Sequence, residues 1–229
     1  MAIKKTILSA VIGSHAHGLQ TDKSDLDIIE VYIAPTVEMF DIYNFTQKQT
    51  KQTFQGNVDI FSAELNHFVR GALKGNPKFL EVLWSPIELE KTDEGRALKK
   101  VREAFLSQQI VPAFKGITSS MVSKYHKNGN IKNLRNAVYM VDLFQHLWTT
   151  NEVFLEIEDL KLFHDKVESY KIDPGILVEH IQDFSEKVYT DIPELPEIQV
   201  IQNVVDKIRI KNLPLHMHLN TLYTKEVKI

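Results

Sequence analysis

Residues 13–27 have the sequence GSHAHGLQTDKSDLD, in which a glycine–serine pair is followed by two aspartates on either side of one leucine. The apolar residues 7–12 before this segment are typical of a buried strand, and residues 26–33, rich in β-branched side chains, predict a second strand. Because side chains on a strand alternate between its two faces, Asp25 and Asp27 are expected to lie side by side. The segment therefore predicts a turn between two strands, with paired carboxylates at its end.

A third carboxylate, Asp59, lies in the next segment that is typical of a strand. The glycine and asparagine at residues 56–57 predict a hairpin turn that leads into it from an edge strand within residues 45–54. If the Asp59 strand pairs beside residues 26–33, its carboxylate completes a cluster with the two earlier aspartates. Asp41 is a rival for this third position, but its surroundings are more typical of a loop or helix.

Three clustered carboxylates point to a divalent metal site. Like charges this close are unfavourable unless a cation lies between them. Oxygen ligands are those that Mg²⁺ prefers, with Mn²⁺ as the alternative. Two ions held in this way serve the attacking and the leaving oxygen of a phosphoryl displacement. We therefore predict Asp25, Asp27 and Asp59 as catalytic residues and metal ligands.

The glycine–serine pair predicts a phosphate-binding turn. Gly13 permits close approach of the backbone to a phosphate, and the Ser14 hydroxyl and the following amides can hold a triphosphate. Ser24, which immediately precedes the aspartates, is assigned to the same nucleotide-binding set.

A basic stretch over residues 124–135 contains four Lys or Arg residues and no acidic residue. Lys132 and Arg135 stand three apart at the start of a predicted helix and can share one face. They are predicted to hold nucleotide phosphates or an acceptor strand. The competing interpretation is a solvated face, which is the commoner role of so short a charge run.

Other polar residues have simpler interpretations. His17 is interpreted as a polar residue at the start of a helix, whereas the role of His15 is left open. Asn76 and Pro77 are explained as the cap and first position of a short helix. Glu81, in that helix, is interpreted as a solvated residue rather than a substrate contact.

Composition excludes several other classes of protein. The 229 residues carry 27 basic and 30 acidic side chains, a net charge of −3, so any polynucleotide has to be held by a local basic patch. The absence of cysteine excludes thiol catalysis and disulfide scaffolds. The apolar run 7–12 is too short for a signal core or a membrane span. These features predict a cytoplasmic protein with no membrane partner.

Hydrophobic periodicity divides the chain in two. Residues 1–91 predict a mixed α/β catalytic domain, in which Ser62 caps a helix over residues 63–74. Residues 92–229 have almost only helical patterns and are predicted to form a helical domain that completes the substrate cleft. Two predicted helices there have apolar faces, formed by Leu134, Val138, Val141 and Trp148, and by Ile198, Ile201, Val205 and Ile208.

The pattern of Gly-Ser followed by Ser-Asp-x-Asp resembles the signature of the DNA polymerase β-like nucleotidyltransferases. The full segment GSHAHGLQTDKSDLD, with VDIFS, KGNPKFLEVLW and KNLRNAVYMVDLF downstream, is similar to the YcgL-type predicted nucleotidyltransferases. The resemblance implies an α+β fold, with a mixed β-sheet palm and flanking helices followed by an all-helical C-terminal half. It also implies magnesium-dependent transfer of a nucleoside monophosphate from an NTP such as ATP. The acceptor stays open between RNA or tRNA, a protein and a small molecule.

Two alternatives compete with an enzyme that is complete in this chain. One is a catalytically silent nucleotide- or RNA-binding module of the same fold, against which the three intact aspartates argue. The other is half of a two-protein module, against which the attached helical half argues.

Overall fold

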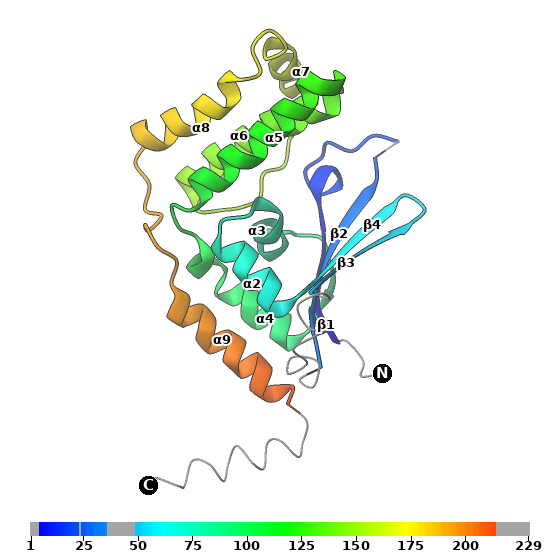
Figure 1. Ribbon diagram of the computed structural model, residues 1–229, viewed down its shortest axis with the longest axis vertical. Coiled ribbons are helices and arrows are strands. Elements are labelled where there is room, and N and C mark those ends of the chain that lie inside the picture. Colours follow the sequence, from blue (N-terminus) through cyan, green and yellow to red (C-terminus); the bar gives the residue numbers. More distant parts are fainter. Residues whose placement is uncertain (1–4, 23, 36–48, 214–229) are drawn as a thin grey trace, which may run out of the picture.

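The computed structural model describes residues 5–22, 24–35 and 49–213, and in these ranges a five-stranded mixed sheet forms the first half (Figure 1). Its strands are β1 (Lys5–Ile12), β2 (Leu26–Ile33), β3 (Thr50–Gln55), β4 (Val58–Glu64) and β5 (Glu88–Lys91). They lie in the order β3-β4-β2-β1-β5, and β2 and β4 run parallel while the other neighbours are antiparallel. The predicted α+β class is confirmed.

The predicted strands of the first half are present with small shifts. The turn at residues 56–57 joins β3 to β4, and β3 is the edge strand. Asp41 and the start of the predicted 45–54 strand fall outside the described residues. The short strand β5 was not predicted, because its sequence ELEK has no apolar alternation; it is added to the sheet by main-chain pairing with β1.

Helices α2 (Leu65–Leu73), α3 (Pro77–Trp84) and α4 (Asp93–Lys100) cover one face of the sheet (Figure 1). The predicted cap of α3 is confirmed, since Asn76 accepts a hydrogen bond from the Lys78 amide at 3.1 Å and Pro77 follows it. The predicted cap at Ser62 is wrong. Strand β4 extends to Glu64, whose carboxylate caps α2, while the Ser62 hydroxyl donates to Glu30.

A layer of helices lies beyond the end of the sheet at which β2 and β4 begin (Figure 1). It comprises α5 (Ile110–Asn128), α6 (Ile131–Thr150), α7 (Leu160–Ser169) and α8 (Ile176–Lys187), and it follows a short helical turn, η3 (Arg102–Phe105). Helix α6 is its core, because the predicted apolar residues Leu134, Val138, Val141 and Trp148 are all buried. Among the described residues, none of the helices is both long and apolar enough to cross a membrane.

The last described helix, α9 (Ile198–Lys211), returns to the first half of the chain (Figure 1). Its buried apolar residues are those predicted from the sequence, except for Ile198, which is exposed. Its Arg209 donates to Glu64 at 2.5 Å and to Asn66 at 3.0 Å, and Lys211 pairs with Glu94 at 3.1 Å. Helix α4 therefore packs on β1, and α9 packs on α4 and η3, although both helices follow residue 91. The domain boundary placed there stays a prediction.

Two segments of chain connect the helical layer to the rest of the molecule. The first, residues 106–109, leads into α5, and the second, residues 188–197, leads from α8 to α9. They are joined by a hydrogen bond from the Gln108 amide to the Pro193 carbonyl at 2.9 Å. A further bond, from the Glu197 amide to the Ala104 carbonyl at 2.9 Å, fixes the second segment beside η3.

Candidate active site

Two of the predicted aspartates lie next to each other on the sheet. Asp27 of β2 is in register with Asp59 of the parallel neighbour β4, so both project from the same face. Both side chains are half-buried. Burial raises the pKa of Asp27, and the charges of Asp59 and Asp25 raise it further, whereas Lys78 and Lys132 act to lower it. The pairing of the two strands, predicted as a condition for the site, is confirmed.

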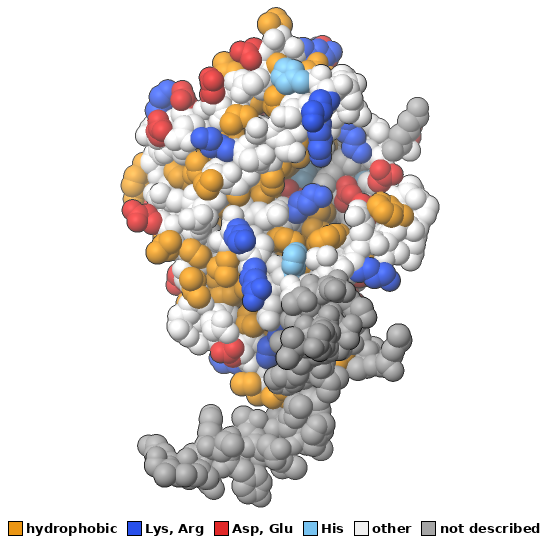
Figure 2. Space-filling view, viewed as in Figure 1, with side chains coloured by type: hydrophobic (Ala, Val, Ile, Leu, Met, Phe, Trp, Pro, Cys, Tyr) orange, Lys and Arg blue, Asp and Glu red, His pale blue; other side chains and the backbone are white. Residues whose placement is uncertain are grey.

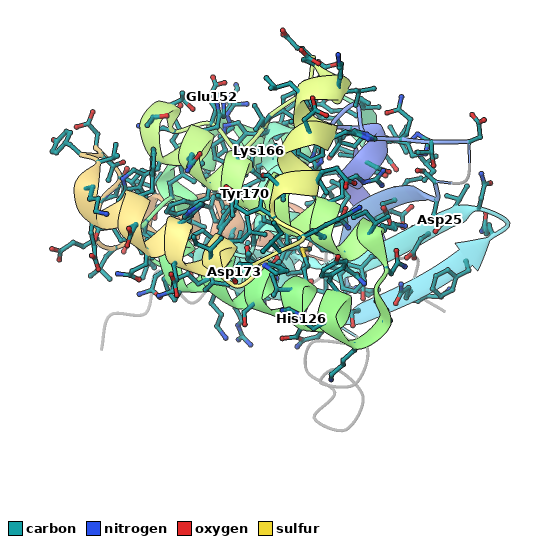
Figure 3. The ribbon with its side chains drawn as sticks, turned by 90° about the horizontal axis from the view of Figure 1, so that it is seen from above. Asp25, His126, Glu152, Lys166, Tyr170 and Asp173 are labelled. Atoms are coloured by element: carbon teal, nitrogen blue, oxygen red, sulfur yellow. The ribbon has the colours of Figure 1, made fainter. Side chains whose placement is uncertain are left out.

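Asp59 and Asp25 differ in their surroundings. The side-chain amide of Gln52 on β3 donates to both Asp59 carboxylate oxygens, at 3.1 and 2.9 Å. Asp25 is exposed one residue before β2, on the side of the β3–β4 hairpin (Figure 3). Within the described ranges, no three acidic or histidine side chains converge into a ready-made metal site. The assignment of the three aspartates as metal ligands stays a prediction.

The backbone at Gly13 lies directly against Asp27. Gly13 has a φ of 68°, and a Cβ atom built on it would be only 2.8 Å from Asp27 Oδ2. A glycine is required at this position on both grounds. The amides of Ala16 and His17 bond back to the Gly13 carbonyl at 3.0 and 3.1 Å, which forms the short helical turn η1 (Gly13–His15).

A cavity of ≈ 460 Å³ lies between α3 and helices α5 and α6, with Asp27 on its wall. Gly13 and Ser14 also line it, and the Ser14 hydroxyl has no hydrogen-bond partner among the described residues. Lys78, Lys124 and Lys132 bring positive charge to the same wall. We call this the central cavity. A smaller cavity of ≈ 250 Å³ lies beside it, contains both Asp27 and Asp59, and shares Lys78 with it.

A third cavity, of ≈ 450 Å³, is separate from the aspartates. It is lined by Thr21 and Ser24 from the loop before β2, by Lys132 and Arg135 from α6, and by α7. We call it the side cavity. Lys132 lines both the central and the side cavity, whereas Ser24 and Arg135 line only the latter. The predicted nucleotide-binding residues are thus divided between two adjoining spaces.

The interpretation of Glu81 as a solvated residue is wrong, and His17, interpreted as a polar residue at a helix start, lies buried just after η1. The exposed fractions of His17 and Glu81 are 3% and 5%, and His17 Nε2 lies 3.5 Å from Glu81 Oε2. The His17 ring also stacks on Tyr139 of α6, with centroids 4.2 Å apart, and both histidine and glutamate line the central cavity. Sequence reasoning missed this contact because a polar residue can be buried when it meets a polar partner that is distant in the sequence.

The role of His15, left open from the sequence, is structural in this arrangement. Its Nε2 lies 3.3 Å from the Ser24 carbonyl, and this contact holds η1 against the loop before β2. Sequence reasoning also missed Lys78 and Gln52. Lys78 is contained in the KGNPKFLEVLW block that carries the resemblance, and its place two residues after the Asn76 cap could have indicated a cation at the helix start.

The structure combines a mixed sheet, paired aspartates on adjacent strands, a glycine–serine turn beside them and an attached helical layer. These features define the class of polymerase β-like nucleotidyltransferases. The family model of the RNA repair pathway DNA polymerase beta family (RlaP) matches residues 2–150, which is more than half of the chain. The chain therefore belongs to this family. The superfamily predicted from the sequence motif is confirmed.

Individual relatives are more distant. The chain is 26% identical over 179 residues to an uncharacterized 38.9 kDa protein of Enterobacteria phage T4 from the nrdC-mobD intergenic region. The match covers 73% of this chain and 52% of the phage protein, so the chain spans about half the length of this relative. A solved nucleotidyltransferase-like protein from Exiguobacterium sibiricum 255-15 is 10% identical, with a TM-score of 0.31 over 91% of this chain and 71% of that one.

Proposed function

We propose that this chain transfers a nucleoside monophosphate from an NTP to a hydroxyl group of RNA and releases pyrophosphate. The observation that carries the proposal is the register of Asp27 with Asp59, beside Gly13 and at the wall of the central cavity. Two half-buried carboxylates on neighbouring strands are unfavourable alone, and the raised pKa of Asp27 reflects burial and this crowding. Such a pair fits a divalent cation, which removes the repulsion.

The residues that would hold Mg²⁺ or Mn²⁺ are Asp25, Asp27 and Asp59. The ion would supply charge neutralisation at the reacting phosphate and orientation of the attacking hydroxyl. Their chemistry fits this group, because all three offer carboxylate oxygens and Asp25 adds charge to the Asp27 site.

The triphosphate is placed in the central cavity. Gly13 gives the backbone close access to the aspartates, and the unpartnered Ser14 hydroxyl can donate to a phosphate oxygen. Lys78 and Lys132 act on Asp27 electrostatically and would neutralise the phosphate oxygens. In the reaction, the acceptor oxygen forms a bond to the α-phosphorus and loses its proton, and the bond to the pyrophosphate oxygen breaks. Catalysis comes from positioning and charge neutralisation.

RNA is proposed as the acceptor for two reasons. The family is described by its place in RNA repair. In addition, the net charge of −3 requires any polynucleotide to be held locally, and Figure 2 shows Lys and Arg side chains gathered along the hollow of this face.

The proposal is tested by incubating the protein with each α-labelled NTP and Mg²⁺, with and without a pool of short RNAs that end in a 3′ hydroxyl. Label should be transferred to RNA, and Asp27→Asn should abolish the transfer. Asp22→Asn is the matched control, because Asp22 is an exposed carboxylate in the loop that precedes β2. Nucleotide binding without transfer, equal in wild type and Asp27→Asn, would favour the silent module.

A further inference from the structure

Among the described residues, the side cavity has a partly buried arginine with no ion pair to an acidic side chain. Arg135 lines it from α6, and its Nε atom is buried without a hydrogen-bond partner among the described residues. Burial lowers the pKa of Arg135, and no neighbouring charge contributes to that shift. A partly buried guanidinium without a counter-ion is costly, and an anionic ligand would compensate for it.

The other charges of the side cavity favour an anion as well. Lys132 adds a second cation, and it lies in the first turn of the 20-residue helix α6, whose dipole is positive at that end. The acidic residue of the lining is Glu168, which is exposed and paired with Lys171 at 2.7 Å. Its charge is therefore neutralised by a neighbour on its own side of the cavity.

The position of the side cavity argues against the triphosphate as its ligand. Asp27, Gly13 and Ser14 line the central cavity and are absent from the side cavity. Lys132 lines both, so it forms the border between them. The phosphodiester backbone of an RNA strand whose end lies beside Asp27 would cross this border and continue past Arg135.

We infer that the side cavity binds the phosphodiester backbone of the acceptor RNA, next to the nucleotide that carries the reacting hydroxyl. This inference rests on the proposed function for the identity of the reacting end. Arg135 provides a planar guanidinium that matches a phosphate in two hydrogen bonds, and Lys132 contacts the adjoining phosphate. Within the basic stretch, Arg135 thus binds the acceptor RNA, whereas Lys132 contacts both the acceptor RNA and the nucleotide.

The test measures RNA binding in the absence of NTP, with a fluorescent single-stranded RNA that ends in a 3′ hydroxyl. Arg135→Ala should raise the Kd by about 10-fold or more, the scale of a hydrogen bond to a charged group. The plot of the logarithm of the RNA association constant against the logarithm of the salt concentration has a negative slope. The magnitude of this slope should decrease by about 0.7 with the loss of one phosphate contact. Arg135→Lys should be intermediate, because it keeps the charge and loses the paired geometry.

Lys127→Ala is the matched control. Lys127 belongs to the same basic stretch and is exposed, but lines none of the three cavities described above. It should leave the Kd for RNA within about twofold of the wild type, since a distant surface charge acts only through the screened field of the protein.

Three results would overturn the inference. If Arg135→Ala bound RNA as tightly as the wild type, Arg135 would not contact the RNA. If Arg135→Ala and Lys127→Ala lost equal affinity, the effect would come from the overall positive charge and not from a contact in the side cavity. A loss of affinity for a non-hydrolysable NTP with Mg²⁺, with RNA binding intact, would assign the side cavity to the triphosphate. Failure of the proposed function is distinguishable: Arg135-dependent RNA binding would then persist in a protein that transfers no label from any NTP.

Discussion

The crowding of Asp27 and Asp59 makes a quantitative prediction about metal and stability. Adjacent strands are about 4.8 Å apart, and two unit charges near that distance repel by roughly 3 kcal/mol at an effective dielectric constant of 20, or below 1 kcal/mol in water. Both carboxylates are half-buried, and Lys78 and Lys132 offset part of the repulsion. Neutralising Asp27 should therefore stabilise the metal-free protein by about 1 kcal/mol.

Thermal melts of the wild type and Asp27→Asn, with and without Mg²⁺ or Mn²⁺, measure this effect. For a chain of this size, about 1 kcal/mol corresponds to roughly 2–4 °C in Tm, so metal-free Asp27→Asn should melt higher than the wild type by that amount. Metal at 100 times its Kd stabilises by about 2.7 kcal/mol, which should raise the wild-type Tm by roughly 5–10 °C. Most of this rise should be absent in Asp27→Asn.

The control for these melts is Asp22→Asn, which removes an exposed carboxylate from the loop before β2 and should respond to metal as the wild type does. An equal rise in wild type and Asp27→Asn would place the metal elsewhere. A lower Tm for metal-free Asp27→Asn would show that the carboxylate is stabilised by its lysine neighbours, and the reasoning from crowding would fail.

Three further predictions concern single positions. Gly13→Ala should abolish nucleotidyl transfer and destabilise the fold by roughly 1–3 kcal/mol, because its positive φ and the 2.8 Å approach to Asp27 leave no room for a methyl group; activity assays and urea unfolding check both effects. His17→Ala should cost about 3–5 kcal/mol in the free energy of unfolding, since it leaves Glu81 buried and unpaired, and His17→Ala combined with Glu81→Leu should recover part of that loss. Burial acts to raise the pKa of Glu94, but hydrogen bonds from Lys5 and others lower this pKa well below its ordinary value near 4.5. The ionised Glu94 therefore stabilises the fold above about pH 4.5, and this stabilisation is lost as the pH falls. The difference in unfolding free energy between wild type and Glu94→Gln should accordingly be largest near neutral pH and shrink between about pH 5 and 3; a difference independent of pH would contradict this account.

The sequence predicted what local periodicity and turn chemistry determine. The alternation around Asp27 and the hairpin before Asp59 were sufficient to place each carboxylate on a strand, and the Asn76 cap was sufficient to start α3. The pairing of the two strands was a condition, which the structure confirms. These features depend on residues close to one another in the chain. The central assignment of the first half could therefore be made without the structure.

The remaining features depend on contacts between residues far apart in the sequence. Glu81 has His17 as its buried neighbour, with Oε2 and Nε2 3.5 Å apart, and Glu64 accepts a hydrogen bond from Arg209, which lies 145 residues away. No local pattern announces such partners, so buried polar residues resemble solvated ones. The division of the basic stretch between two cavities was also invisible, because it depends on which loop packs against each turn of α6.

The two hydrogen-bonded connections of the helical layer have a mechanical consequence. Helices α5 to α8 are inserted between residues 106–109 and 188–197, and the bond from Gln108 to Pro193 ties these segments into one joint. In Figure 1 the segment from α8 to α9 runs along the side of the molecule opposite the strands. A group of helices attached through two adjacent chain segments can rotate most easily as a rigid body about those segments, which act as a hinge.

Such a rotation would separate α6 from the sheet at the far side. Among the described residues, contacts that cross there include the hydrogen bond from the Ile157 amide to the His17 carbonyl at 3.0 Å and the stacking of the His17 ring on Tyr139. We expect these two contacts to break when substrates enter the central cavity. The connection between residues 106–109 and 188–197, together with helix α9, would keep the two parts in register for closure. His17, which also lies 3.5 Å from Glu81, would then set how readily the helical layer rotates away from the sheet.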